Sequence, residues 1–155
     1  MMRRQLTISA LLLALLPNAY AGEPVSTGFW GNTAIGGRDT TAYYIPEMRK
    51  SHSSIEGDKR FEVQYLGAAW RFASQESAQR FAASPQQYVP RYNGHCANAL
   101  ALGEGLIATD GTVWEFFGDR LHLFYGEAGR QRWLKGDWKA FQATADSAWK
   151  AIVKQ

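Results

Sequence analysis

The chain contains a single cysteine, Cys96, among its 155 residues. One cysteine cannot form a disulfide within the chain, so every fold that depends on internal disulfide bridges is excluded. An apolar core must hold the protein together instead. The length of the chain and its hydrophobic content of 46% are sufficient for one such core. We therefore expect a single folded domain.

The first 21 residues have the pattern of a secretory signal peptide. A basic segment (1–5) precedes an apolar run (6–16), and Ala19-Tyr20-Ala21 provides a cleavage site with small residues. The apolar run has about half of the roughly 20 residues that a membrane-spanning helix requires. We predict cleavage after Ala21 and a periplasmic or secreted protein that has no membrane partner after cleavage.

The charge of the remaining chain is close to neutral. The full sequence has 17 lysine and arginine residues against 14 aspartate and glutamate residues, a net charge of +3. Removal of Arg3 and Arg4 with the signal peptide reduces the basic residues to 15 and the net charge to +1. No cluster of basic residues remains, so the sequence does not indicate a nucleic-acid partner.

Two segments are expected to lack regular structure. Residues 22–37 are rich in glycine, serine and threonine, and they predict an extended N-terminal arm that Phe29 and Trp30 fix to the body of the protein. Residues 49–59 are mostly polar and predict a loop that carries His52. Residues 38–155 are expected to form the domain itself.

Alternating patterns predict two β-hairpins. Aromatic or β-branched residues alternate with polar ones at 60–65 and again at 69–72, and the Leu-Gly pair between these runs can form a turn. A second pair of short strands is expected at 113–117 and 121–125, also separated by a turn that contains glycine.

Short helices are predicted between and before these hairpins. Ser74 is expected to cap a helix over 75–83, where apolar residues share one face. Pro85 is expected to start a further helical turn, because proline is tolerated at the first helical position. Cys96 lies in the first turn of a third predicted helix, which ends before Gly103.

The C-terminal segment predicts an amphipathic helix that Asp137 caps. Its apolar residues recur at steps of three and four and form one stripe, which we expect to pack against the sheet. The stripe consists of Trp138, Phe141, Ala145, Ala148, Trp149 and Ile152. Together these elements predict an α+β fold, in which small antiparallel β-hairpins pack with short helices and a C-terminal amphipathic helix.

A series of short motifs accompanies these elements in a distinctive order. They are Gly37-Arg38-Asp39 with Ala42-Tyr43, Tyr65-x-Gly67-x-x-Trp70-x-Phe72, Phe81-x-x-x-Pro85-x-x-Tyr88-x-Pro90-x-Tyr92, Gly94-x-Cys96-Ala97, and Trp114 ahead of Leu121-His122-Leu123. In this order they resemble exported YHS-domain proteins over most of the mature chain. The resemblance implies one YHS-like domain over residues 38–155, with a cysteine at the start of a helix.

The chain departs from the YHS pattern in two places. The segment Arg38–Thr41 lacks the tyrosine and the proline that are usual in the opening segment of the family, so a shared role for this loop does not carry over. The position before the cysteine is usually aromatic in the family and is His95 here.

The resemblance also implies a metal-binding role, because YHS domains resemble the metal-handling modules attached to copper-transporting ATPases. The positive end of a helix favours a thiolate at Cys96, and a thiolate is a suitable ligand for Cu(I) or Zn(II). Imidazole ligands are available from His95, His122 and His52. The sequence therefore predicts a copper or zinc site with two or three protein ligands, centred on Cys96.

Other interpretations of the same residues stay open. In one alternative to a metal site, Cys96 is a small hydrophobic residue buried in the core. In another, it is the reactive thiol of a redox protein. His122 alternates with Leu121 and Leu123, so it is expected on the opposite side of the strand, facing solvent or a rim. His52 is expected to be exposed.

A binding module for a small organic ligand or a periplasmic protein partner is the remaining alternative. Aromatic side chains with polar tips are available either to line such a pocket or to fill the core. They are Trp30, Tyr43, Tyr44, Trp70, Tyr88, Tyr92 and Trp114. No residue is predicted to be catalytic, and the protein is expected not to be an enzyme.

Overall fold

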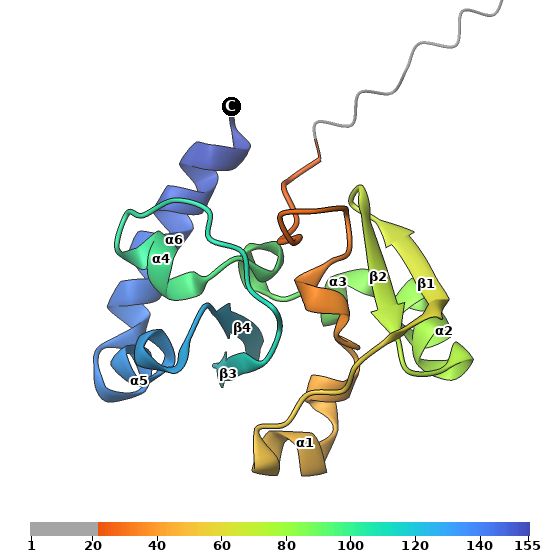
Figure 1. Ribbon diagram of the computed structural model, residues 1–155. Helices are drawn as coiled ribbons and strands as arrows, with labels where there is room; N and C mark the ends of the chain where they lie inside the picture. The colour runs from red at the N-terminus through yellow and green to blue at the C-terminus, as the bar shows by residue number, and fades with distance from the viewer. Residues whose placement is uncertain (1–21) are drawn as a thin grey trace, which may run out of the picture.

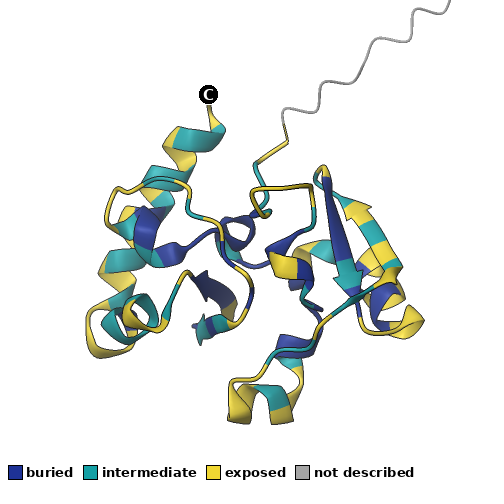
Figure 2. Cartoon of the chain, in the orientation of Figure 1, coloured by how far each residue is buried: buried dark blue, intermediate teal, exposed yellow. Residues whose placement is uncertain are grey.

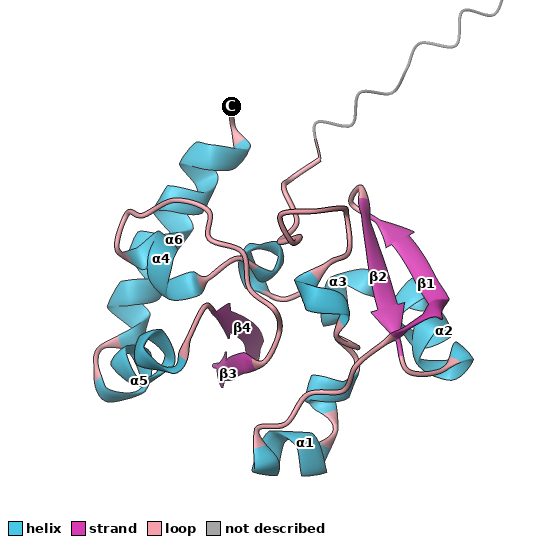
Figure 3. Ribbon diagram, viewed as in Figure 1, coloured by secondary structure: helices cyan, strands magenta, loops and turns pink. Residues whose placement is uncertain are grey.

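The computed structural model describes residues 22–155. The predicted signal peptide, residues 1–21, lies outside the described residues. Within 22–155 the chain forms two separate antiparallel sheets of two strands each, six α-helices and three short 3₁₀ helices (Figures 1 and 3). This arrangement confirms the predicted α+β class. None of the described helices is long and apolar enough to cross a membrane.

The first predicted hairpin is present. It consists of β1 (Asp58–Tyr65) and β2 (Ala68–Phe72), which pair antiparallel. The two turn residues, Leu66 and Gly67, have φ angles of 51° and 75°. Positive φ at both central residues is the geometry of a type I′ turn, whose twist matches that of the strands it joins.

Helices α2 (Gln75–Ala83) and α3 (Pro85–Tyr88) follow this hairpin as predicted. The side chain of Ser74 caps α2. The ring of Phe81 is fully buried and stacks on Trp70 of β2, with ring centroids 5.3 Å apart. This contact holds α2 against the first hairpin.

A further helix, α1 (Pro46–Ser51), extends into the segment that the sequence predicts to be a loop. Proline at the first helical position and Glu47 in the first turn both favour a helix start there. The helix ends at His52, whose φ is 51°. The loop prediction is therefore wrong for residues 49–51, where local helix signals outweigh the polar composition.

The second predicted hairpin, β3 (Val113–Phe117) with β4 (Arg120–Phe124), is buried on both faces. One face joins a first hydrophobic cluster and the other a second. The first cluster consists of Ala34, Ile35, Tyr43, Ala68, Trp70, Phe72, Ala78, Phe81, Tyr88, Val89, Trp114, Leu121 and Leu123. The second cluster consists of Tyr92, Ala97, Leu100, Phe117, Phe124, Trp133 and Ala145. Figure 2 shows this burial on β2, β4 and α4.

Three helices surround the second cluster: α4 (Ala97–Ala101), α5 (Glu127–Lys135) and α6 (Trp138–Val153). The Asp137 carboxylate caps α6, as predicted, by accepting a hydrogen bond from a backbone N–H of its first turn at 3.2 Å. The apolar stripe of α6 joins the second cluster and packs chiefly on α4 rather than on the sheet. The sequence did not predict α5, whose one buried residue is Trp133.

The N-terminal arm is attached to the body by residues other than those expected. Ser26 and Ile35 are fully buried, and the backbone N–H of Ser26 donates to the carbonyl of Asn93 at 2.9 Å. Phe29 and Trp30, in contrast, are 90% and 88% exposed, and their rings contact each other edge to face. The prediction that these two rings fix the arm is wrong, because they lie in the exposed loop between Thr27 and Ala34, which pair with each other.

Candidate functional site

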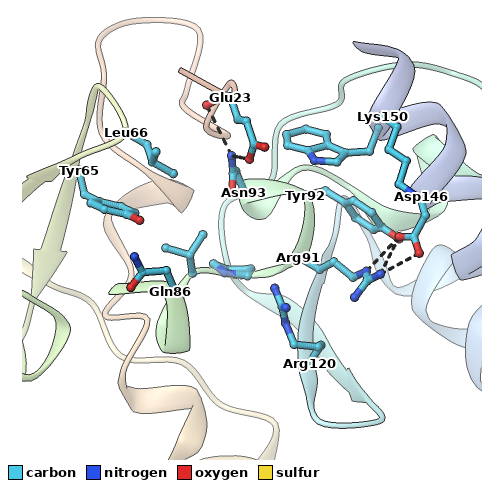
Figure 4. Close-up of a pocket in the computed structure, with 13 residues that line it drawn as sticks. Glu23, Tyr65, Leu66, Gln86, Arg91, Tyr92, Asn93, Arg120, Asp146 and Lys150 are labelled. Atoms are coloured by element: carbon cyan, nitrogen blue, oxygen red, sulfur yellow. Dashed lines mark hydrogen bonds and ion pairs between the residues drawn. The ribbon is translucent and has the colours of Figure 1, made fainter. Parts of the chain in front are cut away.

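A cleft of about 500 Å³ opens where the arm, the first hairpin and α6 meet. Its lining residues come from segments that are far apart in the sequence. Figure 4 shows Tyr65, Leu66 and Gln86 on one side, Tyr92, Asp146 and Lys150 on the other, and Glu23 and Arg120 at opposite ends. Val89, Pro90, Arg91, Asn93 and Trp149 complete the lining. This volume is in the usual range for sites that bind small molecules.

The floor of the cleft is the short 3₁₀ helix η3 (Arg91–Gly94), which has an unusual backbone. Tyr92 and Asn93 have φ angles of 58° and 50°, and Gly94 follows at 84°. Positive φ is unfavourable for a tyrosine, and such strain persists only where surrounding contacts enforce it. Here the contacts are those of Asn93 with the arm and of the tyrosine ring with the second cluster. Strained residues of this kind concentrate at functional sites.

One wall of the cleft is a single face of α6. Asp146, Trp149 and Lys150 are three and four residues apart, so they share that face. The Asp146 carboxylate binds the Arg91 guanidinium through two nitrogens, with the shortest N–O distance at 2.7 Å, and it accepts the Tyr92 hydroxyl at 2.9 Å. These bonds tie η3 to α6 and orient both side chains.

The same contacts determine the protonation states of Arg91 and Tyr92. Burial alone would lower the pKa of Arg91, but its hydrogen bonds with Asp146 outweigh that effect and the net shift is upward. Burial, together with the carboxylate, raises the pKa of Tyr92 well above its usual value. Arg91 is therefore a permanent cation at physiological pH and Tyr92 a permanent neutral hydroxyl.

Two further cations reach the cleft, Arg120 at the start of β4 and Lys150 on α6. Their charged groups make no hydrogen bond or ion pair with any described residue. The acidic groups in the cleft already have partners. Asp146 binds Arg91, and the Glu23 carboxylate lies 3.4 Å from the side-chain nitrogen Nδ2 of Asn93. Cationic groups therefore remain available for a ligand.

Cys96 lies elsewhere, as the N-cap residue of α4. It is 3% exposed, and its Sγ accepts a hydrogen bond from the backbone N–H of Tyr125 at 3.3 Å. Its own N–H donates to the carbonyl of Ile107 at 2.8 Å. Cys96 thus joins α4 to the chain after β4, and this matches the alternative in which it is a small buried residue.

His95 is also buried, and it is bonded to η3. Its Nδ1 lies 3.0 Å from the carbonyl oxygen of Tyr92, and its ring lies beside that of Trp149. Burial lowers the pKa of His95 from its usual value. The ring is therefore a neutral structural group behind one wall of the cleft.

The prediction that His122 faces solvent or a rim is wrong, because its side chain is fully buried. It does lie on the strand face opposite Leu121 and Leu123, but that face is covered by the second cluster, with Phe117 and Trp133 within 5.5 Å between ring centroids. Alternation along a strand gives the direction of a side chain and not what covers it.

His52 is exposed, as expected, and belongs to a surface network. Its Nε2 lies 3.0 Å from a carboxylate oxygen of Glu115, which also binds Arg130 at 2.8 Å. The imidazole stacks on Trp114 with ring centroids 5.0 Å apart. These contacts attach the end of α1 to the second hairpin.

The four predicted metal ligands do not form a suitable donor set. Within residues 22–155 there is no group of three or more histidine, cysteine, aspartate or glutamate side chains placed to hold a metal ion. The Cys96 sulfur and one nitrogen of each histidine already have hydrogen-bonding partners in the protein. A two-ligand copper or zinc site at Cys96 stays a prediction from the sequence.

Sequence reasoning missed most of the cleft. Of the seven aromatic residues proposed for a pocket, one, Tyr92, lines the cleft, whereas Tyr43, Trp70 and Trp114 are core residues. One local signal was available, the spacing of Asp146, Trp149 and Lys150 on one helix face. No local signal indicated that Glu23 and Arg120 meet there.

Comparisons of the chain with protein-family models, with curated proteins and with solved structures found no match. The resemblance to YHS-domain proteins therefore stays a prediction based on the order of the motifs.

Proposed function

We propose that this protein is an exported, non-catalytic binding domain whose cleft takes a small organic ligand with an aromatic or apolar body and an anionic oxygen group. The cleft is then the site of the small-ligand alternative, and Cys96 has a structural role. The observation that supports it most directly is the pair of cations, Arg120 and Lys150, which line the cleft without a partner among the described residues.

The remaining lining suits the body of such a ligand. The aromatic side chains of Tyr65 and Trp149 and the apolar side chains of Leu66, Val89 and Pro90 provide surfaces for a ring. The guanidinium of Arg91, held in place by Asp146, is pre-oriented, so little conformational entropy is lost when it contacts an anion. Fixed protonation at Arg91 and Tyr92 favours binding over proton transfer.

Calorimetric titration with naphthyl phosphate, naphthoate and neutral naphthol tests the proposal. The three probes share one aromatic body and differ in the anionic group, so we expect the two anions to bind at least about tenfold more tightly than naphthol. The phosphate and the carboxylate probe together identify which anionic group the cleft prefers.

Substitution of the cations locates the binding. In the double variant Arg120→Gln/Lys150→Gln we expect the affinity for the preferred anion to fall about tenfold, because charge-assisted hydrogen bonds are lost. Lys135→Gln, at the end of α5 and outside the cleft, removes one exposed cation and serves as the control. Equal affinity of the natural protein, the double variant and the control would refute the proposal. So would the absence of a preference for the anions over naphthol.

A further inference from the structure

The arm brings the beginning of the predicted mature chain to the cleft. Gly22, Glu23 and Pro24 line a second hollow of about 490 Å³ together with the turn of the first hairpin. This hollow and the cleft share three lining residues, Glu23, Tyr65 and Leu66. The two spaces are therefore neighbours, and Gly22 lines the second hollow directly before Glu23, which lines both.

The position of this part of the arm is fixed by the floor of the cleft. The side-chain nitrogen Nδ2 of Asn93 lies 3.5 Å from the backbone carbonyl oxygen of Glu23 and 3.4 Å from the Glu23 carboxylate. Three residues further on, Ser26 is fully buried, donates its N–H to the Asn93 carbonyl and accepts a hydrogen bond from the N–H of Thr109 at 2.9 Å. Gly22 is thus one residue away from a fixed contact.

Removal of the predicted signal peptide would change the charge at Gly22. Hydrolysis of the Ala21–Gly22 peptide bond consumes one water molecule and leaves a carboxylate on Ala21 and an amino group on Gly22. An α-amino group has an ordinary pKa of about 7.7–8.0, so most of it is protonated at neutral pH. Before cleavage, the same nitrogen is an uncharged amide and the chain continues from it.

We infer that signal-peptide cleavage completes the binding site, because the new Gly22 ammonium adds a positive charge beside the Glu23 end of the cleft and so favours an anionic ligand. The uncleaved precursor lacks this charge, so the protein binds its ligand well only after export. This inference rests on the proposed function of the cleft and on the predicted cleavage after Ala21. It assigns a role to Gly22 that depends on its backbone nitrogen and not on a side chain.

The full chain, purified uncleaved and then cut by a signal peptidase, provides the test. Binding of naphthyl phosphate is measured by calorimetry before and after cutting, with the new N-terminus verified as Gly22 by mass spectrometry. Part of the cut protein is acetylated once at about pH 6.5, where the α-amino group reacts before the lysines, whose pKa is about 10.4. Acetylation removes the charge and adds little bulk.

We expect the cut protein to bind about tenfold more tightly than the acetylated protein, since one positive charge beside the cleft is lost. The uncleaved chain should resemble the acetylated form. Equal affinity of the cut and acetylated forms would overturn the role of the amino group while leaving the cleft intact, even if the uncleaved chain bound less well. Absence of binding in all three forms would instead refute the proposed function.

Discussion

His122 presents a polar atom to the apolar interior without a partner. Its Nδ1 lies 2.9 Å from the carbonyl oxygen of Arg120, so that nitrogen carries the proton of the neutral ring. Its Nε2 has no hydrogen-bond partner among the described residues. Protonation there would place a cation among aromatic rings, and burial accordingly lowers the pKa of His122 from 6.5 to about 4.

We predict that this residue makes the protein less stable in acid. In the unfolded chain His122 takes up a proton near pH 6.5, whereas in the folded protein it does so only near pH 4, so the unfolded state binds the proton first. The contribution of His122 to the free energy of unfolding should fall by about 3 kcal/mol as the pH drops from 6.5 to about 4, with no further loss from this residue below that range. Denaturant unfolding at a series of pH values measures this loss.

The variant His122→Asn separates this contribution from those of other groups. The asparagine amide can still donate to the Arg120 carbonyl, but it does not titrate. The stability advantage of the natural protein over the variant should therefore shrink between pH 6.5 and 4. An unchanged pH dependence in the variant would assign the effect to another residue, such as His95, whose pKa burial also lowers.

The α2 helix depends on a capping box at its N-terminus. The Ser74 hydroxyl accepts the N–H of Ser77 at 3.1 Å, and the Ser77 hydroxyl accepts the N–H of Ser74 at 3.2 Å. Two backbone donors that the helix itself cannot satisfy are thereby paired. Because α2 places Phe81 in the first cluster, a weakened helix start should reduce the stability of the whole domain.

We predict that Ser74→Ala lowers the free energy of unfolding by about 1 kcal/mol, the usual cost of losing an N-cap side chain. Ser84→Ala is the matched control, since Ser84 precedes α3 but makes no capping bond with its side chain. The control should change stability by less than about 0.5 kcal/mol. Equal effects of both substitutions in chemical denaturation would contradict a specific role for the capping box.

Helices α2 and α5 differ in how strongly their own residues indicate a helix. Ser74 and the apolar face of α2 are signals within one helix, so the helix was predicted with its cap. In α5 the only buried residue is Trp133, and no apolar periodicity marks the helix. Its position depends on the second cluster, which forms from several segments and cannot be recognised locally.

The two hydrophobic clusters are joined through the β3–β4 hairpin. Leu123 and Phe124 are adjacent and fully buried, yet they belong to different clusters because successive strand residues point to opposite faces. A hairpin buried on both faces should couple the two clusters, so that neither unfolds alone.

We predict that Leu123→Ala and Phe124→Ala each destabilise the entire molecule. Expected losses are about 2–5 kcal/mol for the leucine and about 3–5 kcal/mol for the phenylalanine, because each leaves a cavity in a packed interior. Unfolding followed by circular dichroism and by tryptophan fluorescence should give coincident single transitions. Two separate transitions in either variant would show that the clusters fold independently.

The hairpins, the helix caps at Ser74 and Asp137 and the apolar stripe of α6 could be recognised from residue order alone, because each depends on neighbours within a few positions. The burial of His122, the exposure of Phe29 and Trp30 and the meeting of Glu23, Arg120 and Asp146 in one cleft could not. These features depend on which distant segments cover a given face, and a local pattern specifies the direction of a side chain but not the partner that it meets.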